Sequence, residues 1–227
     1  MNKYYLRQNT HLGKDSIQKL KESTVIVVGL GGLGSGVAQI LARMGVGSLI
    51  LIDDDSVQEH NLSRQQLYTI KDIDKPKVLA AKKHLSQINP EINIKTFQKM
   101  ASENFFEKIE KITCVVDCTD RHESRRIIDS ACLKRNIPWV HGAAIREEGL
   151  VCVFGGKYSL KSYEDIYKNK TIDEFCEGVV APITNLISSL QASLVIKIIL
   201  QKPIPEGILR INLDDWSFDN LNISSRV

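Results

Sequence analysis

The chain has 227 residues, of which 43% are hydrophobic and 25% charged, which is enough for one sizeable α/β core, so we expect a single soluble domain over residues 1–227. A formal net charge of +3 without a basic run does not favour nucleic-acid binding. The N-terminus has no signal-like apolar run, and no segment approaches the roughly 20 apolar residues of a membrane span. Neither export nor membrane insertion is therefore expected.

The first half of the chain alternates between expected strands and helices. Residues 24–28 form an apolar, β-branched run that is typical of a strand buried on both faces of a parallel sheet. Further strands are predicted at 48–53, 92–97, 114–117 and 139–141, and helices at 37–44, 77–87, 103–109 and 123–135. This alternation predicts a doubly wound, Rossmann-like α/β fold with a mostly parallel sheet, in which ligands bind beyond the carboxyl ends of the strands.

The pattern changes after residue 143. A strand at 150–154, a long apolar helix at 183–200 and short strands at 208–213 and 218–223 predict antiparallel C-terminal strands that close the sheet. Residues 157–177 are polar without a clear period, so we expect a functional loop there. We divide the chain into an N-terminal helical arm (1–23), a nucleotide-binding half (24–143) and a second half (144–227).

A glycine-rich segment joins the first expected strand to a helix. Its glycines can form a tight turn and allow backbone N–H groups to approach a phosphate or ribose; they are Gly29, Gly31, Gly32 and Gly34. Asp53 ends the second strand, where a carboxylate accepts hydrogen bonds from ribose hydroxyls. These residues alone fit an NAD-dependent oxidoreductase equally well.

Polar and cationic residues after the second strand favour phosphate chemistry. Asp55, Asn61, Arg64 and Gln65 follow this strand, and Lys77 begins the next expected helix. Arginine offers a planar fork and lysine a compact charge to phosphate oxygens, whereas hydride transfer needs no such cations beside the nucleotide. A solvated turn and a surface lysine are the plainer alternatives for these residues.

Asp120 follows the fourth expected strand in the run Asp117-Cys118-Thr119-Asp120. A carboxylate that faces a triphosphate normally holds Mg²⁺, which prefers oxygen ligands and bridges phosphates. Asp120 is therefore the candidate magnesium ligand. The alternative is that it caps the following helix, since Asp is a favoured N-cap residue.

Taken together, these motifs resemble the MoeB/ThiF/HesA family, the prokaryotic relatives of ubiquitin-activating enzymes. The matching segments are Arg7-Gln8 and residues 28–34, 45–55, 61–65, 75–77, 117–120, 142–149 and 178–182. They extend over nearly the whole chain, and their order is far more specific than the glycines alone.

The resemblance implies a role for each matched position. The glycine loop and Asp53 would hold the adenosine of ATP, with Asp55 beside them, and Asn61, Arg64, Gln65 and Lys77 would contact the phosphates. Asp120 would organise Mg²⁺. Arg7 would reach into the nucleotide site of a neighbouring subunit, which implies a homodimer.

The resemblance also implies an activity. The enzyme would be a cytoplasmic adenylyltransferase that forms an acyl-adenylate on the Gly-Gly carboxylate of a ubiquitin-like sulfur carrier, ThiS-like or MoaD-like, for thiamine or molybdenum-cofactor synthesis. Residues 144–227 would then bind the carrier, with 157–177 as a crossover loop. Alternatives are an adenylating dehydratase that acts on tRNA threonylcarbamoyladenosine and a non-catalytic nucleotide-binding scaffold.

Two departures concern cysteine. Many members of the family bind zinc through two Cys-x-x-Cys pairs, which this chain lacks, so no zinc is expected. Its five cysteines are scattered, as is usual in a reducing cytoplasm: Cys114, Cys118, Cys132, Cys152 and Cys176. Cys176 lies near where some relatives place a sulfur-transfer cysteine, and an incidental loop cysteine is the alternative.

Overall fold

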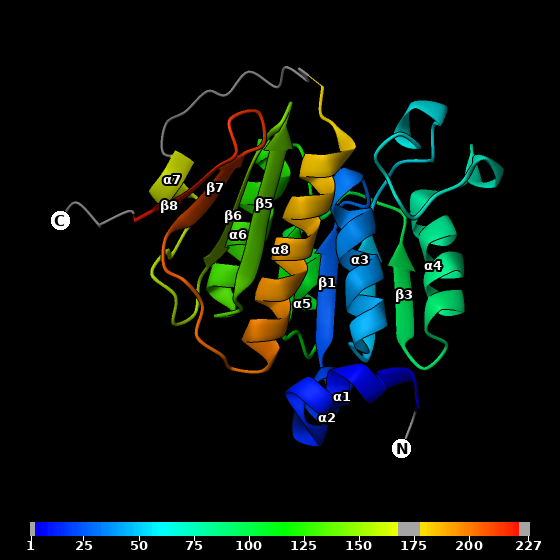
Figure 1. Cartoon of the computed structure of the whole chain (residues 1–227), viewed down its shortest axis with the longest axis horizontal. Helices are drawn as coiled ribbons and strands as arrows, with labels where there is room; N and C mark the ends of the chain where they lie inside the picture. Colours follow the sequence, from blue (N-terminus) through cyan, green and yellow to red (C-terminus); the bar gives the residue numbers. More distant parts are fainter. Residues whose placement is uncertain (1–2, 168–177, 223–227) are drawn as a thin grey trace.

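A single eight-stranded sheet forms the centre of the computed structural model, which describes residues 3–167 and 178–222 (Figure 1). The strand order is β3-β2-β1-β4-β5-β6-β7-β8. The parallel strands are β1 (Thr24–Val28), β2 (Ser48–Ile52), β3 (Asn93–Phe97), β4 (Cys114–Asp117) and β5 (Trp139–Ile145). The antiparallel strands are β6 (Glu148–Phe154), β7 (Ile208–Asn212) and β8 (Ser217–Leu221). The predicted fold class is confirmed.

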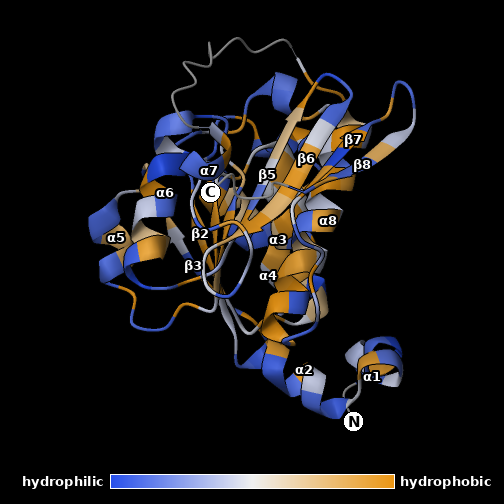
Figure 2. Ribbon diagram, turned by 90° about the vertical axis from the view of Figure 1, so that its left-hand side faces the viewer, coloured by the Kyte–Doolittle hydropathy of each residue, from blue (hydrophilic) through white to orange (hydrophobic). Residues whose placement is uncertain are grey.

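Helices cover both faces of the sheet, and the side chains of each strand alternate between the two layers. On one face, Val25 and Val27 pack with α3 (Gly32–Met44), α4 (Lys77–Ile88) and α8 (Ala181–Ile199). On the other, Ile26 and Val28 pack with α5 (Glu103–Glu107) and α6 (His122–Lys134). Hydrophilic residues gather on the outward sides of α5 and α6 (Figure 2). Two-sided burial explains why the four buried residues of β1, 25–28, are all apolar.

The N-terminal residues form a short 3-10 turn, η1 (Lys3–Tyr5), and two helices, α1 (Leu6–Leu12) and α2 (Lys14–Lys21). They lie below the amino ends of the parallel strands (Figure 1). The Gly47 N–H donates to Leu20 O at 2.9 Å, and Asn89 Nδ2 donates to the Tyr5 hydroxyl at 2.7 Å. The arm is thus attached to the end of the sheet that is opposite the expected ligand site.

Helix α8 is apolar on almost every side because it packs between α3 and strands β5 and β6. By length and composition alone it could cross a membrane, contrary to the expectation above, and within the described residues it is the only such helix. Half of its apolar window is buried inside the fold, as in the core helix of a soluble protein. A built Cβ on Gly36 would lie 2.7 Å from Ser188 Oγ, so the glycine allows α3 to approach α8 closely.

The predicted loop at 157–177 is described as far as residue 167, and this part contains a short helix. Leu160 and Tyr163 are buried, and α7 (Glu164–Tyr167) follows them. These two apolar side chains anchor the segment against the sheet, an effect that local periodicity does not reveal. Similarly, the segment between β2 and α4 contains two unpredicted 3-10 turns, η2 (Glu59–Asn61) and η3 (Ile70–Asp72).

Candidate active site

The candidate site lies at the carboxyl ends of β1, β2 and β4. The chain runs outward from β1 through β2 to β3 and then returns to the other side of β1 as β4. This reversal of strand order is the position where doubly wound sheets bind their ligands. The glycine loop leaves β1 there, Asp53 follows β2, and residues 117–120, here called the acid loop, end β4 and follow it.

The four predicted glycines divide into two kinds. Gly29 has a φ of 85°, and a Cβ on it would lie 2.7 Å from Cys118 O; a Cβ on Gly34 would lie only 1.8 Å from Gly29 O. These two are required by backbone packing. A Cβ on Gly32 would lie 3.1 Å from Thr184 Cγ2 and 3.8 Å from Arg64 Cγ, whereas the nearest atom to a Cβ on Gly31 is Gln65 Nε2 at 3.7 Å. Gly31 is therefore the glycine of the four that leaves room beside the loop for a ligand.

Asp53 joins the glycine loop to the end of β2. Its Oδ2 accepts a hydrogen bond from Leu30 N at 2.6 Å, and its Oδ1 accepts one from Asp55 N at 2.8 Å. Burial raises the pKa of this carboxyl, and the nearby Lys77 charge and the two N–H donors partly oppose the rise. Each carboxylate oxygen keeps a further lone pair, so Asp53 can hold the loop and still accept a ribose hydroxyl.

Lys77 is not the solvated surface lysine of the plainer alternative. Its side chain is 7% exposed, and Nζ lies 2.7 Å from Asp55 Oδ2. The backbone makes a second link between the same residues, because Lys77 N donates to Asp55 O at 3.0 Å. The first residue of α4 therefore presents a partly desolvated ammonium group next to the strand end that carries Asp53.

The Asn61–Gln65 turn, between β2 and α4, is the next part of the site. Asn61 Oδ1 accepts from Gln58 N at 3.0 Å, which fixes η2, and Arg64 Nη1 donates to His60 O at 3.1 Å. Gln65 is 3% exposed, and its Oε1 has no hydrogen-bond partner among the described residues. Its Nε2 lies 3.7 Å from the position of a Cβ on Gly31. An unsatisfied buried acceptor beside the glycine loop fits a ligand that brings a donor.

Asp120 is exposed at the end of the acid loop. The loop lies against β1, because Cys118 N donates to Val28 O at 2.8 Å. Asp120 does not cap α6: the N-cap residue is Arg121, and no side-chain capping hydrogen bond is present there among the described residues. No hydrogen bond or ion pair to another described residue occupies its carboxylate. An unpaired carboxylate of this kind fits the oxygen-rich coordination of Mg²⁺.

A second group of carboxylates, Asp53, Asp54 and Asp55, has ligand atoms within 4.8 Å of one another. Two of the three are already engaged by protein donors, since Asp53 accepts two N–H bonds and Asp55 pairs with Lys77. This cluster is therefore less suited to a metal ion than Asp120, and it serves instead to hold Lys77 and the glycine loop.

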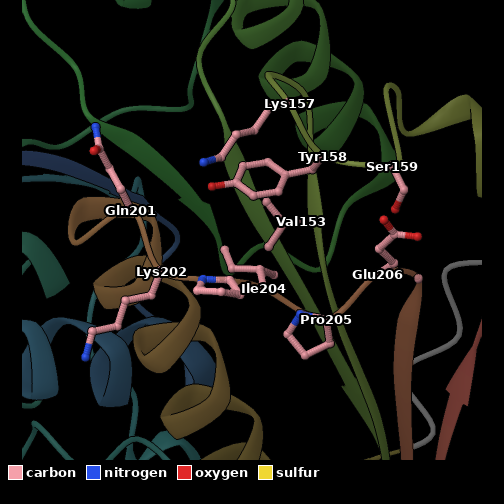
Figure 3. Close-up of a pocket in the computed structure, with 11 residues that line it drawn as sticks. Val153, Lys157, Tyr158, Ser159, Gln201, Lys202, Ile204, Pro205 and Glu206 are labelled. Carbon is pink, nitrogen blue, oxygen red and sulfur yellow. The ribbon is translucent and has the colours of Figure 1, made fainter.

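One predicted residue, Arg7, lies away from the site of its own chain, and another is not described. Arg7 is exposed on α1, at the opposite end of the sheet, and cannot reach the nucleotide site of its own chain. Cys176 lies outside the described residues. A pocket of about 270 Å³ is also remote: it lies between the end of β6 and residues 201–207, near the amino end of β5 (Figure 3).

Sequence reasoning missed a polar cluster behind the acid loop. His141 Nδ1 lies 2.7 Å from Asp117 Oδ2, and Gln191 Nε2 donates to Asp117 O at 2.7 Å. Burial raises the pKa of Asp117, but the hydrogen bond from His141 and the charge of Arg125 outweigh it, so the net pKa is lowered. Burial lowers the pKa of His141. The sequence did contain a signal for this cluster, because Asp117 and His141 are polar residues at the ends of two expected buried strands.

Comparisons with known proteins place the chain among nucleotide-using enzymes. It is 41% identical over 191 residues to the molybdopterin-synthase adenylyltransferase of Haemophilus influenzae, covering 82% of this chain and 79% of that protein. It is 36% identical over 201 residues to the Sulfur carrier protein ThiS adenylyltransferase of Escherichia coli, covering 87% and 80%.

The fold agrees with solved structures. The crystal structure of E. coli MccB with ATP superimposes with a TM-score of 0.85 at 24% identity, covering 99% of this chain and 72% of that one. At this identity the likeness concerns the fold alone. The sequence model of the ThiF family matches residues 5–226. The chain therefore belongs to the ThiF family.

Proposed function

We propose that this protein is an ATP-dependent adenylyltransferase that activates the C-terminal carboxylate of a small ubiquitin-like sulfur carrier with a Gly-Gly tail. The observation that supports the proposal is that the glycine loop, Arg64, Lys77 and Asp120 all belong to segments that leave the carboxyl ends of β1, β2 and β4. The named relatives from H. influenzae and E. coli are adenylyltransferases, and the alternative functions are not favoured.

In the reaction, a carboxylate oxygen of the carrier attacks the α-phosphorus of ATP. The bond between this phosphorus and the bridging oxygen breaks, and pyrophosphate leaves with the electron pair. Gly31 leaves room for the adenosine, Asp53 accepts the ribose hydroxyls, and Arg64 and Lys77 offset the charge that builds on the phosphates. Positioning and charge stabilisation account for the step.

Asp120 would hold Mg²⁺, which neutralises phosphate charge when it is bound. No protein nucleophile is needed for the adenylation. The described cysteines are unsuited to that role, because burial raises the pKa of each of their thiols: Cys114, Cys118, Cys132 and Cys152. A sulfur-transfer role for Cys176 stays a proposal.

We further propose that the enzyme is a cytoplasmic homodimer. Arg7 lies far from the site of its own chain, which is the placement expected if it serves the site of a second copy. The free, buried state of the four described cysteines fits a reducing compartment. Residues 144–227 would bind the carrier, since the antiparallel strands extend the sheet beside the nucleotide site. No zinc is expected.

The test is exchange of labelled pyrophosphate into ATP with purified ThiS-like and MoaD-like carriers. We expect exchange only with a carrier whose Gly-Gly tail is intact, and a carrier that lacks the two glycines is the matched control. Exchange that is absent with every such carrier, although ATP binds, would contradict the proposal. Carrier-independent adenylation of tRNA threonylcarbamoyladenosine would favour the dehydratase, and tight NAD binding would favour the oxidoreductase.

A further inference from the structure

A buried arginine lies directly behind the acid loop and contacts its backbone. Arg125, on the first turns of α6, is 7% exposed. Its Nη2 donates to Thr119 O at 2.8 Å, and its Nε lies 3.6 Å from Asp117 Oδ2. Nε is buried without a hydrogen-bond partner among the described residues. The guanidinium group therefore points at the backbone that carries Asp120 and away from solvent.

The burial of Arg125 is costly in free energy by itself. Placing a guanidinium group out of water is unfavourable unless pairing and hydrogen bonds compensate for the lost hydration. The pKa of Arg125 is nevertheless raised, because Asp117 and the hydroxyl of Tyr163 outweigh the desolvation. A charged group held in such a place usually has a role that an apolar side chain could not fill.

Arg125 does more than neutralise the charge of Asp117. Asp117 Oδ1 accepts from both Thr119 N at 3.0 Å and Thr119 Oγ1 at 2.7 Å, and Oδ2 faces His141 Nδ1 at 2.7 Å. Three donors therefore satisfy this carboxylate without Arg125. What Arg125 alone supplies, among the described residues, is the hydrogen bond to the carbonyl of Thr119, the peptide group that leads directly into Asp120.

We propose that Arg125 is a positioning residue that fixes the acid loop and thereby the direction in which Asp120 presents its carboxylate to the magnesium–nucleotide complex. Arg125 fixes one side of the Thr119 peptide, and Asp117 fixes the other through Thr119 N and Oγ1. With both sides held, Asp120 keeps one orientation although its own side chain has no protein partner among the described residues. The inference rests on the proposed function, since it assumes that Asp120 meets a nucleotide-bound cation.

The test measures nucleotide affinity by calorimetry, with Mg²⁺ present and again with EDTA, in the full chain. We expect Arg125→Gln to weaken ATP binding about tenfold with Mg²⁺, the scale of one lost charge-assisted hydrogen bond, and to leave binding in EDTA within about twofold of wild type. Arg126→Gln is the matched control. It removes the same charge one residue away, but Arg126 is half-exposed and pairs with Glu164 at 2.9 Å, so both affinities should stay unchanged.

A double-variant cycle identifies Asp120 as the group through which Arg125 acts. Asp120→Asn should show the same loss confined to Mg²⁺, and Asp120→Asn with Arg125→Gln should lose little more than either change alone. Additive losses, or losses of equal size in Mg²⁺ and EDTA, would show that Arg125 merely supports the fold and would overturn the inference.

Two further measurements keep the outcomes distinct. If Arg125→Gln does not fold, Arg125→Lys retains the charge without the planar fork and should show a smaller loss that is again confined to Mg²⁺. A wild-type chain that binds no ATP in either condition would contradict the proposed function itself. Wild-type binding that is tightened by Mg²⁺, together with an Arg125→Gln variant that behaves like wild type, would contradict only the positioning role.

Discussion

Two ion pairs of similar length occur in different parts of the sheet and have different consequences. Beside the end of β2, Lys77 Nζ lies 2.7 Å from Asp55 Oδ2; the lysine side chain is 7% exposed, although that of Asp55 is 58% exposed. Between β6 and β7, Arg210 Nη2 lies 2.8 Å from Glu148 Oε2, and both side chains are about half-exposed. Distance alone therefore does not distinguish them.

The two ion pairs differ in how far their charged groups are exposed to solvent. An exposed pair is screened by water and salt, whereas a charge with little access to water interacts strongly with what comes near it. At the carboxyl ends of the parallel strands, Asp53, Lys77 and Asp117 are buried charged residues, whereas Arg210 and Glu148 of the antiparallel half stay in water. We therefore expect substitutions to have graded effects, largest at the parallel strand ends.

The largest effect is expected for Lys77→Ala. Loss of this ammonium group should lower carrier-dependent pyrophosphate exchange by about 10²–10³-fold, as for removal of one group that stabilises transition-state charge. Lys82→Ala, at an exposed position on the same helix, should stay close to wild type. A Lys77→Ala enzyme that is folded and exchanges at a near-normal rate would place the phosphates elsewhere.

Next in size is the effect of Gly34→Ala on stability. Because the new Cβ would lie 1.8 Å from Gly29 O, the glycine loop must shift, and we expect a loss of about 2–4 kcal/mol in the free energy of unfolding. The control is Gly13→Ala in the N-terminal arm; Gly13 has a φ of 82°, and no atom of the described part of the chain lies within 4 Å of a Cβ built on it. It should cost about 1 kcal/mol, because only backbone strain applies. Chemical denaturation measures both changes.

A smaller effect concerns acid stability. Asp72 accepts hydrogen bonds from Thr69 N, Thr69 Oγ1 and His84 Nε2. Burial raises its pKa, but these bonds outweigh burial and lower it to about 2. A lowered folded-state pKa stabilises the protein above the unfolded-state value near 3.8, and this stabilisation, about 1–2 kcal/mol, disappears as the pH falls from about 4 toward 2.

Asp72→Asn should therefore be less stable than wild type at neutral pH and should lose less stability on acidification, which urea unfolding at several pH values measures. Asp215, on the β7–β8 turn, also has a pKa lowered by hydrogen bonds, from Ser217, but it is fully exposed. Asp215→Asn should leave the acid limb of the stability curve unchanged. If Asp72→Asn and Asp215→Asn changed the acid limb of the stability curve equally, burial would not be what distinguishes the two carboxylates.

The smallest effect is expected at the antiparallel edge. Arg210→Gln removes the exposed pair with Glu148, and we expect no resolvable shift in the thermal midpoint and no change in nucleotide affinity. Melting curves at low and high salt measure this. A clear loss of stability in Arg210→Gln at both salt concentrations would mean that the pair is less screened than its exposure implies.

Much of the fold could be predicted because burial leaves a pattern in the sequence. Strands β1, β2 and β4 are nearly continuous apolar runs, since both of their faces are covered. The extent of the β5–β6 hairpin was less clear: β5 runs to Ile145 and β6 begins at Glu148. In β6 one half-buried face weakens the apolar run, and only the pairing with β7 shows that Glu148 belongs to the sheet.

The site could be predicted only in part. The positions of Asp53 and Lys77 followed from the motifs, but their protein partners, Leu30 N and Asp55, depend on how the loops fold over each other. The cluster of Asp117, Arg125 and His141 was missed because His141 lies 24 residues from Asp117 in the chain. Such contacts depend on tertiary packing that a single sequence does not display.

The close crossing of α3 and α8 limits how the enzyme can move. Gly36 leaves no space for a side chain beside Ser188, whose hydroxyl oxygen lies 2.9 Å from Leu33 O in the first turn of α3 and 2.6 Å from Thr184 O in its own helix. The helix that begins at the glycine loop is thus locked to the helix that supports the antiparallel strands. This packing opposes a hinge between α3 and α8, and we expect adjustments of the enzyme to occur in turns and connections.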